Sequence, residues 1–545
     1  MIETEVHQRL RAYLREQGHT QWPHHLTMAR LVARALRVGR SALMQVDSLA
    51  AHQGSHRLSY LIPALLWPEP AILALSDDIL NTVLLQDIPN LQQNLPVVKS
   101  VRSGDSWPSE NENFRGLLVT SAQRWLSSHL DERYLEHLEA ASTSQRFPAG
   151  IPVLIDGVGD LERWARSHLT LSLTAQDWDA LMLAYPNQRP FIRDMRVRVT
   201  HTIFQHPANP YGCHLLEAAE KTLLNELYEV LQFQGDGGRL PLAWQRFWAE
   251  FSQLECGAER MAWSRLNRDL GQVVLQCGPT TISERLAPIW AKQPVVLMGA
   301  ALDTDTKATR YRAQLGLSEM TCLSFGPDRH HDLVQLYLPD RLPLPNTSHF
   351  KSAVLKEIRM LLNARGASIE PNVNHPTVIV IGDMPLKAQF AAILAAEFGS
   401  RVQLEGPIER HGILITGWGY WRSHQATFAA PGLLIITTLP IPSLENPLVA
   451  GRVASYKRQR QDWFQAYLLP EAISELQQAV APVRSHRTSN GTANGGVIAL
   501  LDNRVNYRSY GRQILAALSP IARSSYFNED WFHTDISEPL LDSNT

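Results

Sequence analysis

Apolar residues follow two patterns along this chain. In its first and last thirds, short uninterrupted apolar runs alternate with longer stretches whose apolar residues recur every three or four positions. The short runs are typical of strands buried on both faces, and the longer stretches are typical of amphipathic helices. The alternation therefore predicts an α/β fold with parallel sheets covered by helices.

The plainest short runs lie in the last third of the chain, where a helix that begins after Pro470 separates the second run from the third. These three runs are Gly412–Thr416, Leu433–Thr438 and Gly496–Asp502. A similar run near the N-terminal side starts at Ile151 and ends in an acid, Asp156. The two halves thus repeat one strand–helix plan.

The region from about 170 to 275 has a different pattern. Helical spacing predominates up to Gly271, and the next strand-like run is Val273–Cys277. We therefore predict an all-helical insertion that includes a helix over 258–271. A stripe of four aromatic residues at helical spacing is more typical of a core than of a base-stacking surface, and it comprises Trp244, Phe247, Trp248 and Phe251. The basic cluster Phe191–Val199 is a candidate contact for a nucleic-acid backbone.

Composition limits the function only in part. The chain has 545 residues and a net charge of −2, so any contact with nucleic acid must come from local patches. Its four cysteines are widely separated, which favours reduced thiols over a zinc site or a disulfide framework. The N-terminal segment is a charged amphipathic helix rather than a signal peptide. Prolines interrupt the apolar stretch 58–75, and we expect a cytoplasmic protein with no membrane partner.

The motifs that frame these elements resemble those of the DinG/XPD helicases of superfamily 2. In that family a Leu-x-Tyr-Leu-x-Pro helix follows the first phosphate loop, and an Asp-x-Arg…Tyr-Gly motif ends the second motor domain. The residues that carry the resemblance are Leu58, Tyr60, Leu61, Pro63, Asp87, Ile88, Pro89, Tyr420, Trp421, Asp502, Arg504, Tyr510 and Gly511.

This resemblance implies two RecA-like, P-loop NTPase-type motor domains with parallel sheets and a helical arch-like insertion in the first. The first domain would comprise 1–169 and 276–325, the insertion 170–275, and the second domain 326–535. Residues 536–545 are expected to form a disordered tail, and the polar segment 485–496 a mobile loop.

The resemblance also places a candidate nucleotide site. The family's Gly-Lys-Thr, which holds the ATP phosphates and Mg²⁺, falls on Ser55, His56 and Arg57 after Gly54, and the chain contains no Gly-Lys dipeptide. The fixed lysine charge and the hydroxyl ligand of Mg²⁺ are therefore missing. His56 and Arg57 remain as candidates to attract phosphate.

Two further catalytic positions are altered. The family's metal-binding aspartate is retained as Asp156, the one candidate Mg²⁺ ligand, but the glutamate that orients the attacking water is replaced by Gly157. In the second domain, the arginine that reaches the γ-phosphate falls on Pro482. Gln478 and Arg484 remain as candidate nucleotide contacts. ATP and Mg²⁺ are thus cofactors implied by the resemblance alone.

The resemblance also leads to expectations about an iron–sulfur cluster and about contacts with nucleic acid. Family members with an iron–sulfur cluster insert four cysteines after the Asp-Ile-Pro motif, and residues 95–115 contain none, so no cluster is expected. The resemblance implies single-stranded DNA as the partner. Candidate contacts are basic residues next to aromatic ones, together with the retained tryptophan of the second domain: Arg452, Lys457, Arg458, Arg460 and Trp421.

Two functions of different class follow. The first is a DinG/XPD-like, nucleic-acid-binding DNA helicase homologue whose ATP-dependent unwinding is weakened or lost, because lysine, glutamate and arginine all act on one transition state. In another form of this first hypothesis, the protein still unwinds DNA and holds the ATP phosphates through non-standard contacts that include His56 and Arg57. The alternative is a non-catalytic pseudohelicase that serves as a scaffold for a protein partner.

Overall fold

The structure, a computed structural model, is described for most of the chain. The described residues are all except 18–21, 96–98, 109–112, 137–146, 234–238, 255–258, 328–332, 368–374, 410, 486–495 and 533–545. The expected tail at 536–545 and nearly all of the expected loop at 485–496 lie outside the described residues. Among the described helices, none is long and apolar enough to cross a membrane.

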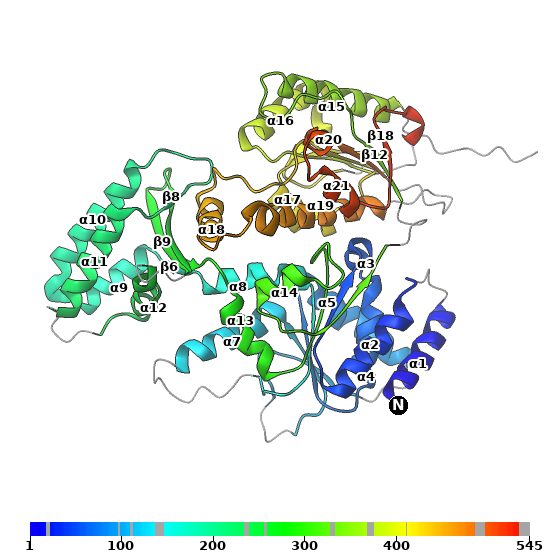
Figure 1. Cartoon of the computed structure of the whole chain (residues 1–545), viewed down its shortest axis with the longest axis horizontal. Helices are drawn as coiled ribbons and strands as arrows, with labels where there is room; N and C mark the ends of the chain where they lie inside the picture. The colour runs from blue at the N-terminus through cyan, green and yellow to red at the C-terminus, as the bar shows by residue number, and fades with distance from the viewer. Residues whose placement is uncertain are drawn as a thin grey trace, which may run out of the picture.

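The first domain is built on a seven-stranded parallel sheet in the order β11-β1-β10-β5-β2-β4-β3 (Figure 1). Its strands are β1 (Ala42–Val46), β2 (Ala71–Leu75), β3 (Val101–Ser103), β4 (Leu117–Ser121), β5 (Val153–Asp156), β10 (Val295–Ala300) and β11 (Thr321–Phe325). Successive side chains of a strand enter opposite layers: Leu43 and Met44, for example, belong to two different apolar cores.

Helices cover both faces of this sheet, as the uninterrupted apolar strands require. One layer comprises α1 (Ile2–Gln17), α2 (His25–Val38), α4 (Leu58–Leu66), α5 (Asp77–Thr82) and α6 (Ile88–Asn94). The other comprises α7 (Ala122–Glu136), α8 (Leu161–Leu169), α13 (Ser283–Lys292) and α14 (Thr309–Leu315).

The second domain repeats this plan with the strand order β14-β15-β13-β16-β17-β12-β18, all parallel. Its strands are β12 (Val334–Tyr337), β13 (Thr377–Val380), β14 (Val402–Leu404), β15 (Ile413–Thr416), β16 (Leu433–Ile436), β17 (Val497–Leu500) and β18 (Ile521–Ser524). Its helices are α15 (Phe350–Ala367), α16 (Met384–Phe398), α17 (Trp418–His424), α18 (Pro447–Arg458), α19 (Leu469–Arg484), α20 (Arg504–Tyr507) and α21 (Gly511–Ala517). The predicted α/β class with two parallel sheets is confirmed.

The insertion corrects the all-helical prediction. Four helices, α9 (Ala175–Ala184), α10 (Arg189–Gln205), α11 (Ala218–Phe233) and α12 (Leu242–Phe251), accompany a four-stranded antiparallel sheet in the order β6-β9-β8-β7. Its strands are β6 (Leu171–Leu173), β7 (Cys213–Leu215), β8 (Arg260–Asn267) and β9 (Gln272–Pro279). The aromatic stripe on α12 is buried in the insertion's core, as predicted.

The predicted helix over 258–271 is wrong, because residues 260–267 form β8 and residues 268–271 form the turn into β9. Ala262 and Leu266 point into the core, and their spacing fits one face of a strand as well as one side of a helix. The two are distinguished at Gly271, which has a left-handed conformation with φ of +61°. It closes a hairpin turn rather than ending a helix.

In Figure 1 the two domains lie one above the other, and helices α17 and α19 of the second domain face the first. The insertion extends to one side, with α18 next to its strand β8. Helix α18 contacts β7 directly, and α19 contacts α3 (Ser48–Gln53) of the first domain. The candidate nucleotide site lies at this interface.

Candidate functional site

The expected phosphate loop between β1 and α4 is folded into helical turns, which corrects the loop prediction. Asp47 begins α3 by accepting a hydrogen bond of 2.7 Å from the N–H of Ala50. Gly54 ends α3 in a left-handed conformation, with φ of +71°. Its N–H donates to Ala51, and the N–H of Arg57 donates to Gly54. These amides therefore satisfy the chain's own carbonyls instead of facing a phosphate.

His56 points at Asp156. Its Nε2 lies 3.1 Å from each carboxylate oxygen, and its Nδ1 lies 3.2 Å from the carbonyl oxygen of Ala50. A carbonyl and a carboxylate only accept hydrogen bonds, so both ring nitrogens donate and the ring is an imidazolium. Burial alone would lower the pKa of His56, but the charge and hydrogen bond of Asp156 outweigh burial and raise it. His56 is only 2% exposed.

Asp156 is fully engaged by protein donors. Besides His56, the hydroxyl of Tyr60 donates to Oδ2 at 2.9 Å, and the N–H of Gly157 donates to Oδ1 at 2.8 Å. Burial acts to raise the pKa of Asp156, yet the His56 charge and the hydrogen bonds from His56 and Tyr60 hold it below its ordinary value. At 4% exposure, the carboxylate serves an internal ion pair.

Gly157, at the position of the family's catalytic glutamate, has a backbone that does not suit a glutamate. Its φ is +79°, a conformation that residues with a Cβ rarely adopt. A Cβ built there would lie 3.3 Å from the hydroxyl oxygen of Ser76. The change at this position therefore involves the backbone as well as the side chain.

Arg57 is also occupied within the first domain. Its guanidinium lies 3.4 Å from a carboxylate oxygen of Asp87 and directly beside the backbone of Gly54. Ser55, the remaining residue of the expected loop, hydrogen-bonds Gln53 at 3.4 Å. Neither side chain points to a shared phosphate position.

Arg422 joins the two domains. It stands where the family has a glutamate, and it donates to Asp160 of the first domain and to Glu475 of α19, each at 2.6 Å. Burial would lower its pKa, but Glu475 and Asp160 outweigh burial and raise it. The arginine that replaces the family's glutamate in the second domain thus forms an ion pair with Asp160, the acid at the start of α8.

Arg452 forms a second connection between the domains. It donates to Glu162 of α8 at 2.6 Å and to the hydroxyl of Tyr467 at 3.1 Å, and its guanidinium lies 4.1 Å from the centre of the Tyr467 ring. Glu162 also accepts from Arg166 at 2.8 Å. Burial alone would raise the pKa of Glu162, but Arg452 and Arg166 hold it below its ordinary value.

The structure corrects two expected nucleic-acid contacts. Arg452 is engaged between the domains, and Trp421 is 1% exposed, with its indole N–H donating to the carbonyl of Ala479 at 3.1 Å. Lys457, Arg458 and Arg460 are exposed at the end of α18 and just beyond it. The ammonium of Lys457 lies 5.5 Å from the ring centre of Trp463.

The second-domain residues expected at the nucleotide are buried or hydrogen-bonded within their own domain. Pro482 is buried, and Arg484 donates to the carbonyls of Pro520, at 3.0 Å, and Leu518 within its own domain. Gln478 bonds Ser474 at 3.3 Å. The cavity between α19 and the ends of β1 and β11 has a volume of about 140 Å³, below the roughly 300 Å³ at which small-molecule pockets begin.

These observations bear on ATP and Mg²⁺, the cofactors that the resemblance implies. The carboxylate of Asp156 already holds three protein donors, the amides of Gly54 and Arg57 are bonded internally, and no arginine stands at Pro482. The residues present do not fit an Mg²⁺–nucleotide bound in the family's manner. No catalytic step through that group can be built on them.

Sequence reasoning missed the partners of the altered residues. Tyr60 appears in the sequence only as a helix-framing residue, and Asp160 and Glu162 only as part of the motif that contains Asp156. One signal was present: Arg422 reverses the charge of a motif glutamate, and a reversal predicts an acid nearby. Which acid it meets depends on how the two domains pack together.

The His56–Asp156 pair should make stability depend on pH. Because the pKa of His56 is raised, its charge stabilises the folded chain fully at pH values below the ordinary histidine pKa. This stabilisation is lost as pH rises through the pKa of the folded state. Because the pKa of Asp156 is lowered, its charge also stabilises the folded chain, and this stabilisation is lost as pH falls through the pKa of Asp156 in the folded state. The stabilisation should therefore be greatest between about pH 4 and 6.5.

Urea unfolding of the unaltered chain and of His56→Gln from acidic to alkaline pH measures this dependence. The difference in unfolding free energy should be largest inside that window and should shrink above it. A difference that stays constant through neutral pH would show that the ring is not charged in the folded chain.

Comparison with known proteins matches both the fold and the motifs. The helicase C-terminal domain family matches residues 430–521. The chain is 23% identical to the ATP-dependent DNA helicase YoaA of Haemophilus influenzae over 264 residues, 47% of this chain and 40% of that protein. It is 23% identical to the ATP-dependent DNA helicase DinG of Photobacterium profundum over 300 residues, 51% of this chain and 42% of that protein. The matches thus span about two fifths of the length of these curated relatives.

Solved structures agree on the fold. A solved XPD helicase superposes with a TM-score of 0.55 at 10% identity, covering 91% of this chain and 98% of the other. Xpd4 of S. tokodaii gives a TM-score of 0.55 at 10% identity, with 92% and 99% covered. At this identity the likeness shows the fold alone, two RecA-like domains. The chain is thus similar to the DinG/XPD-type superfamily 2 helicases in its C-terminal domain, its curated relatives and its fold.

Proposed function

We propose that this chain is a nucleic-acid-binding DinG/XPD homologue that has lost ATP turnover. The observation that carries the proposal is the buried His56–Asp156 pair, in which the residue at the lysine position binds the aspartate expected to hold Mg²⁺. In an active motor these two residues hold the phosphates and the metal. Here each neutralises the other.

The other altered positions support the same proposal. Stabilisation of the transferred phosphoryl group needs positive charge from both domains, and an arginine from the second domain is worth on the order of a thousandfold or more in turnover. At this position the chain has a buried proline, Pro482. The cationic side chains that do cross the interface, Arg422 and Arg452, are bound to carboxylates.

The ion pairs between the domains give the second half of the proposal. A helicase motor opens and closes its two domains with the nucleotide state, a hinge or shear motion. Arg422–Asp160 and Arg452–Glu162 join the two domains directly through ion pairs. We therefore propose a fixed platform that binds DNA in the cytoplasm, where the bacterial relatives are expected to act.

Single-stranded DNA is the proposed ligand, by kinship with proteins named DNA helicases. The exposed basic segment that remains available is Lys457, Arg458 and Arg460, beside Trp463. Cationic side chains next to an aromatic ring suit the backbone and bases of a single strand.

Fluorescence anisotropy with labelled oligothymidine tests this function. The affinity should fall steeply with salt, because binding releases counterions, and it should not respond to ATP and Mg²⁺. Changing Lys457, Arg458 and Arg460 to Glu should weaken binding and flatten the salt dependence by about one slope unit per lost phosphate contact. The matched control is Arg9→Glu with Arg11→Glu, exposed on α1.

The outcomes separate the two functions. An affinity that changes with ATP and Mg²⁺ would contradict the fixed platform. No measurable affinity for DNA at low salt would refute the nucleic-acid role and leave the alternative, a scaffold for a protein partner.

A further inference from the structure

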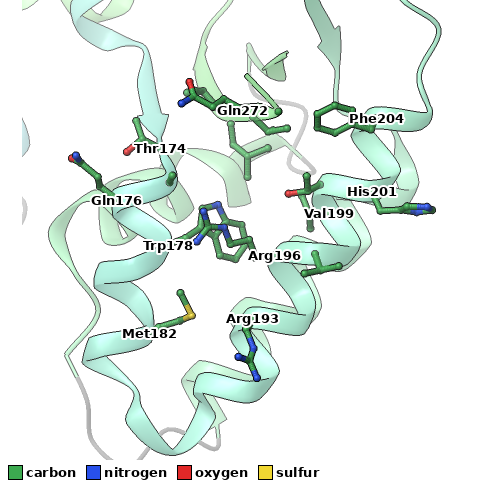
Figure 2. A pocket seen from close by; sticks show the side chains of 17 residues that line it. Thr174, Gln176, Trp178, Met182, Arg193, Arg196, Val199, His201, Phe204 and Gln272 are labelled. Atoms are coloured by element: carbon green, nitrogen blue, oxygen red, sulfur yellow. The ribbon is translucent and has the colours of Figure 1, made fainter. Parts of the chain in front are cut away.

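A groove of about 970 Å³ lies in the insertion, away from the interface between the motor domains. Figure 2 shows it between α9, which carries Thr174 at its start and Met182, and α10, which carries Arg193 and Val199. Gln272 of β9 lies at one end of the groove, and Trp178 lies at its floor. Its volume is in the range of ligand-binding pockets.

An open strand edge borders this groove. Strand β6 ends at Leu173, opposite Leu275, so β9 continues beyond it by three residues, Gln272–Val274. On the other side, β9 pairs with β8 along its whole length. Within the part of the chain that is described, no strand covers this extension of β9.

The backbone direction at Val273 follows from the ladder. Leu266 of β8, which lies opposite Val273, donates its N–H to Gly212 beside β7 at 2.8 Å. Leu266 therefore turns its backbone groups away from β9, and Val273 turns its own away from β8. The N–H and C=O of Val273 thus face the open edge, where an extended chain can pair with them.

The charge of the groove is positive. Arg193, Arg196 and His201 line it, and none of the described lining residues is acidic. Arg196 is paired with Asp179 at 2.9 Å, which leaves Arg193 as the exposed cation of the lining. The third arginine of this basic cluster, Arg198, does not line the groove and lies 3.7 Å from Glu226.

We propose that the groove binds an extended, acidic segment of a partner protein, which adds as a strand to the edge of β9. Alternate apolar side chains of the segment would lie on Met182, Val197 and Val273, and its carboxylates would meet Arg193 and Arg196. Strand addition of this kind takes affinity from main-chain hydrogen bonds and specificity from the side-chain pockets. The proposal is independent of ATP turnover.

A peptide fits this groove better than single-stranded nucleic acid. Bases need exposed aromatic faces, but the Trp178 ring is buried and the Phe204 ring carries the guanidinium of Arg268 at 5.8 Å. Among the large apolar lining side chains, the aliphatic Val197 is the exposed one, at 60%. The basic cluster Phe191–Val199 is thereby assigned to a protein partner rather than to a nucleic-acid backbone.

The test measures binding of the full chain to a fluorescein-labelled decapeptide of alternating valine and glutamate. Three variants probe the three features of the site: Arg193→Glu the charge, Val197→Asp the apolar surface, and Val273→Pro the strand edge. Each should weaken binding about tenfold or more. The matched control, Arg198→Glu, has the same charge change on the same helix and should bind like the unaltered chain.

Two further measurements test whether the peptide pairs with the edge of β9. Proline at 273 removes an N–H that β8 does not use, so the thermal unfolding midpoint should change little. A peptide with the same side chains and N-methylated alternate amides should bind much more weakly than the parent peptide. Failure of the parent peptide to bind, equal loss in Arg198→Glu, or displacement of the peptide by oligothymidine would each overturn the proposal.

Discussion

Replacing Asp156 by alanine is expected to lower the free energy of unfolding by about 3–5 kcal/mol, the loss typical of a broken buried ion pair. The change leaves the His56 ring without its counter-ion and removes the acceptor used by Tyr60 and by the N–H of Gly157. This loss follows from the proposal that Asp156 serves an internal ion pair rather than a metal. Urea unfolding at pH 6 measures the effect.

Two further variants make the result specific. Asp78→Ala, an exposed acid of the same domain, should leave stability close to that of the unaltered chain. The double change His56→Leu with Asp156→Leu should cost less than Asp156→Ala alone, because no unpaired charge remains buried. If Asp156→Ala unfolds at the same urea concentration as the unaltered chain, the pair does not stabilise the fold.

Replacing Arg452 by alanine is the second large effect expected, a loss of about 3–5 kcal/mol of stability. The change leaves Glu162 with Arg166 alone and removes the cation from the Tyr467 ring. Because Arg452 and Glu162 belong to different domains, unfolding should also become less cooperative, with the two domains melting in separate transitions. Differential scanning calorimetry resolves the two transitions.

Helix α18 supplies the control for this change. Arg458 lies on the same helix and is exposed, so Arg458→Ala should leave the calorimetric profile unchanged. A single sharp transition in Arg452→Ala, at the temperature of the unaltered chain, would show that this ion pair does not join the domains.

Much of the fold could be predicted because local pattern and burial agree. A parallel sheet buried on both faces gives uninterrupted apolar runs such as those ending at Asp156 and Thr416, and these became β5 and β15. The insertion was harder, since the spacing of Ala262 and Leu266 satisfies a strand and a helix alike. Only the hairpin turn at Gly271 distinguishes them.

The sequence shows which motif residues of the family are missing, but it does not show which contacts the residues in their place make. That His56, Gly157 and Pro482 break the family's motifs is readable one position at a time. That His56 bonds Asp156 depends on how the turn Ser55–Arg57 meets the end of β5, which no local spacing encodes. The role of Arg452, which is readable in the sequence only as part of a basic patch, depends on which face of α18 meets the other domain.

Nucleotide turnover is the most direct measurement of the central claim, that Asp156 serves an internal ion pair instead of Mg²⁺–ATP. The purified chain is incubated with Mg²⁺ and about 1 mM ATP, near the upper end of ordinary KM values, with and without oligothymidine. Phosphate release and equilibrium dialysis of labelled ATP are followed together, with Asp156→Asn as the matched variant. We predict no saturable ATP binding and release at the background rate in every sample. Saturable, DNA-stimulated release that Asp156→Asn abolishes would contradict the account.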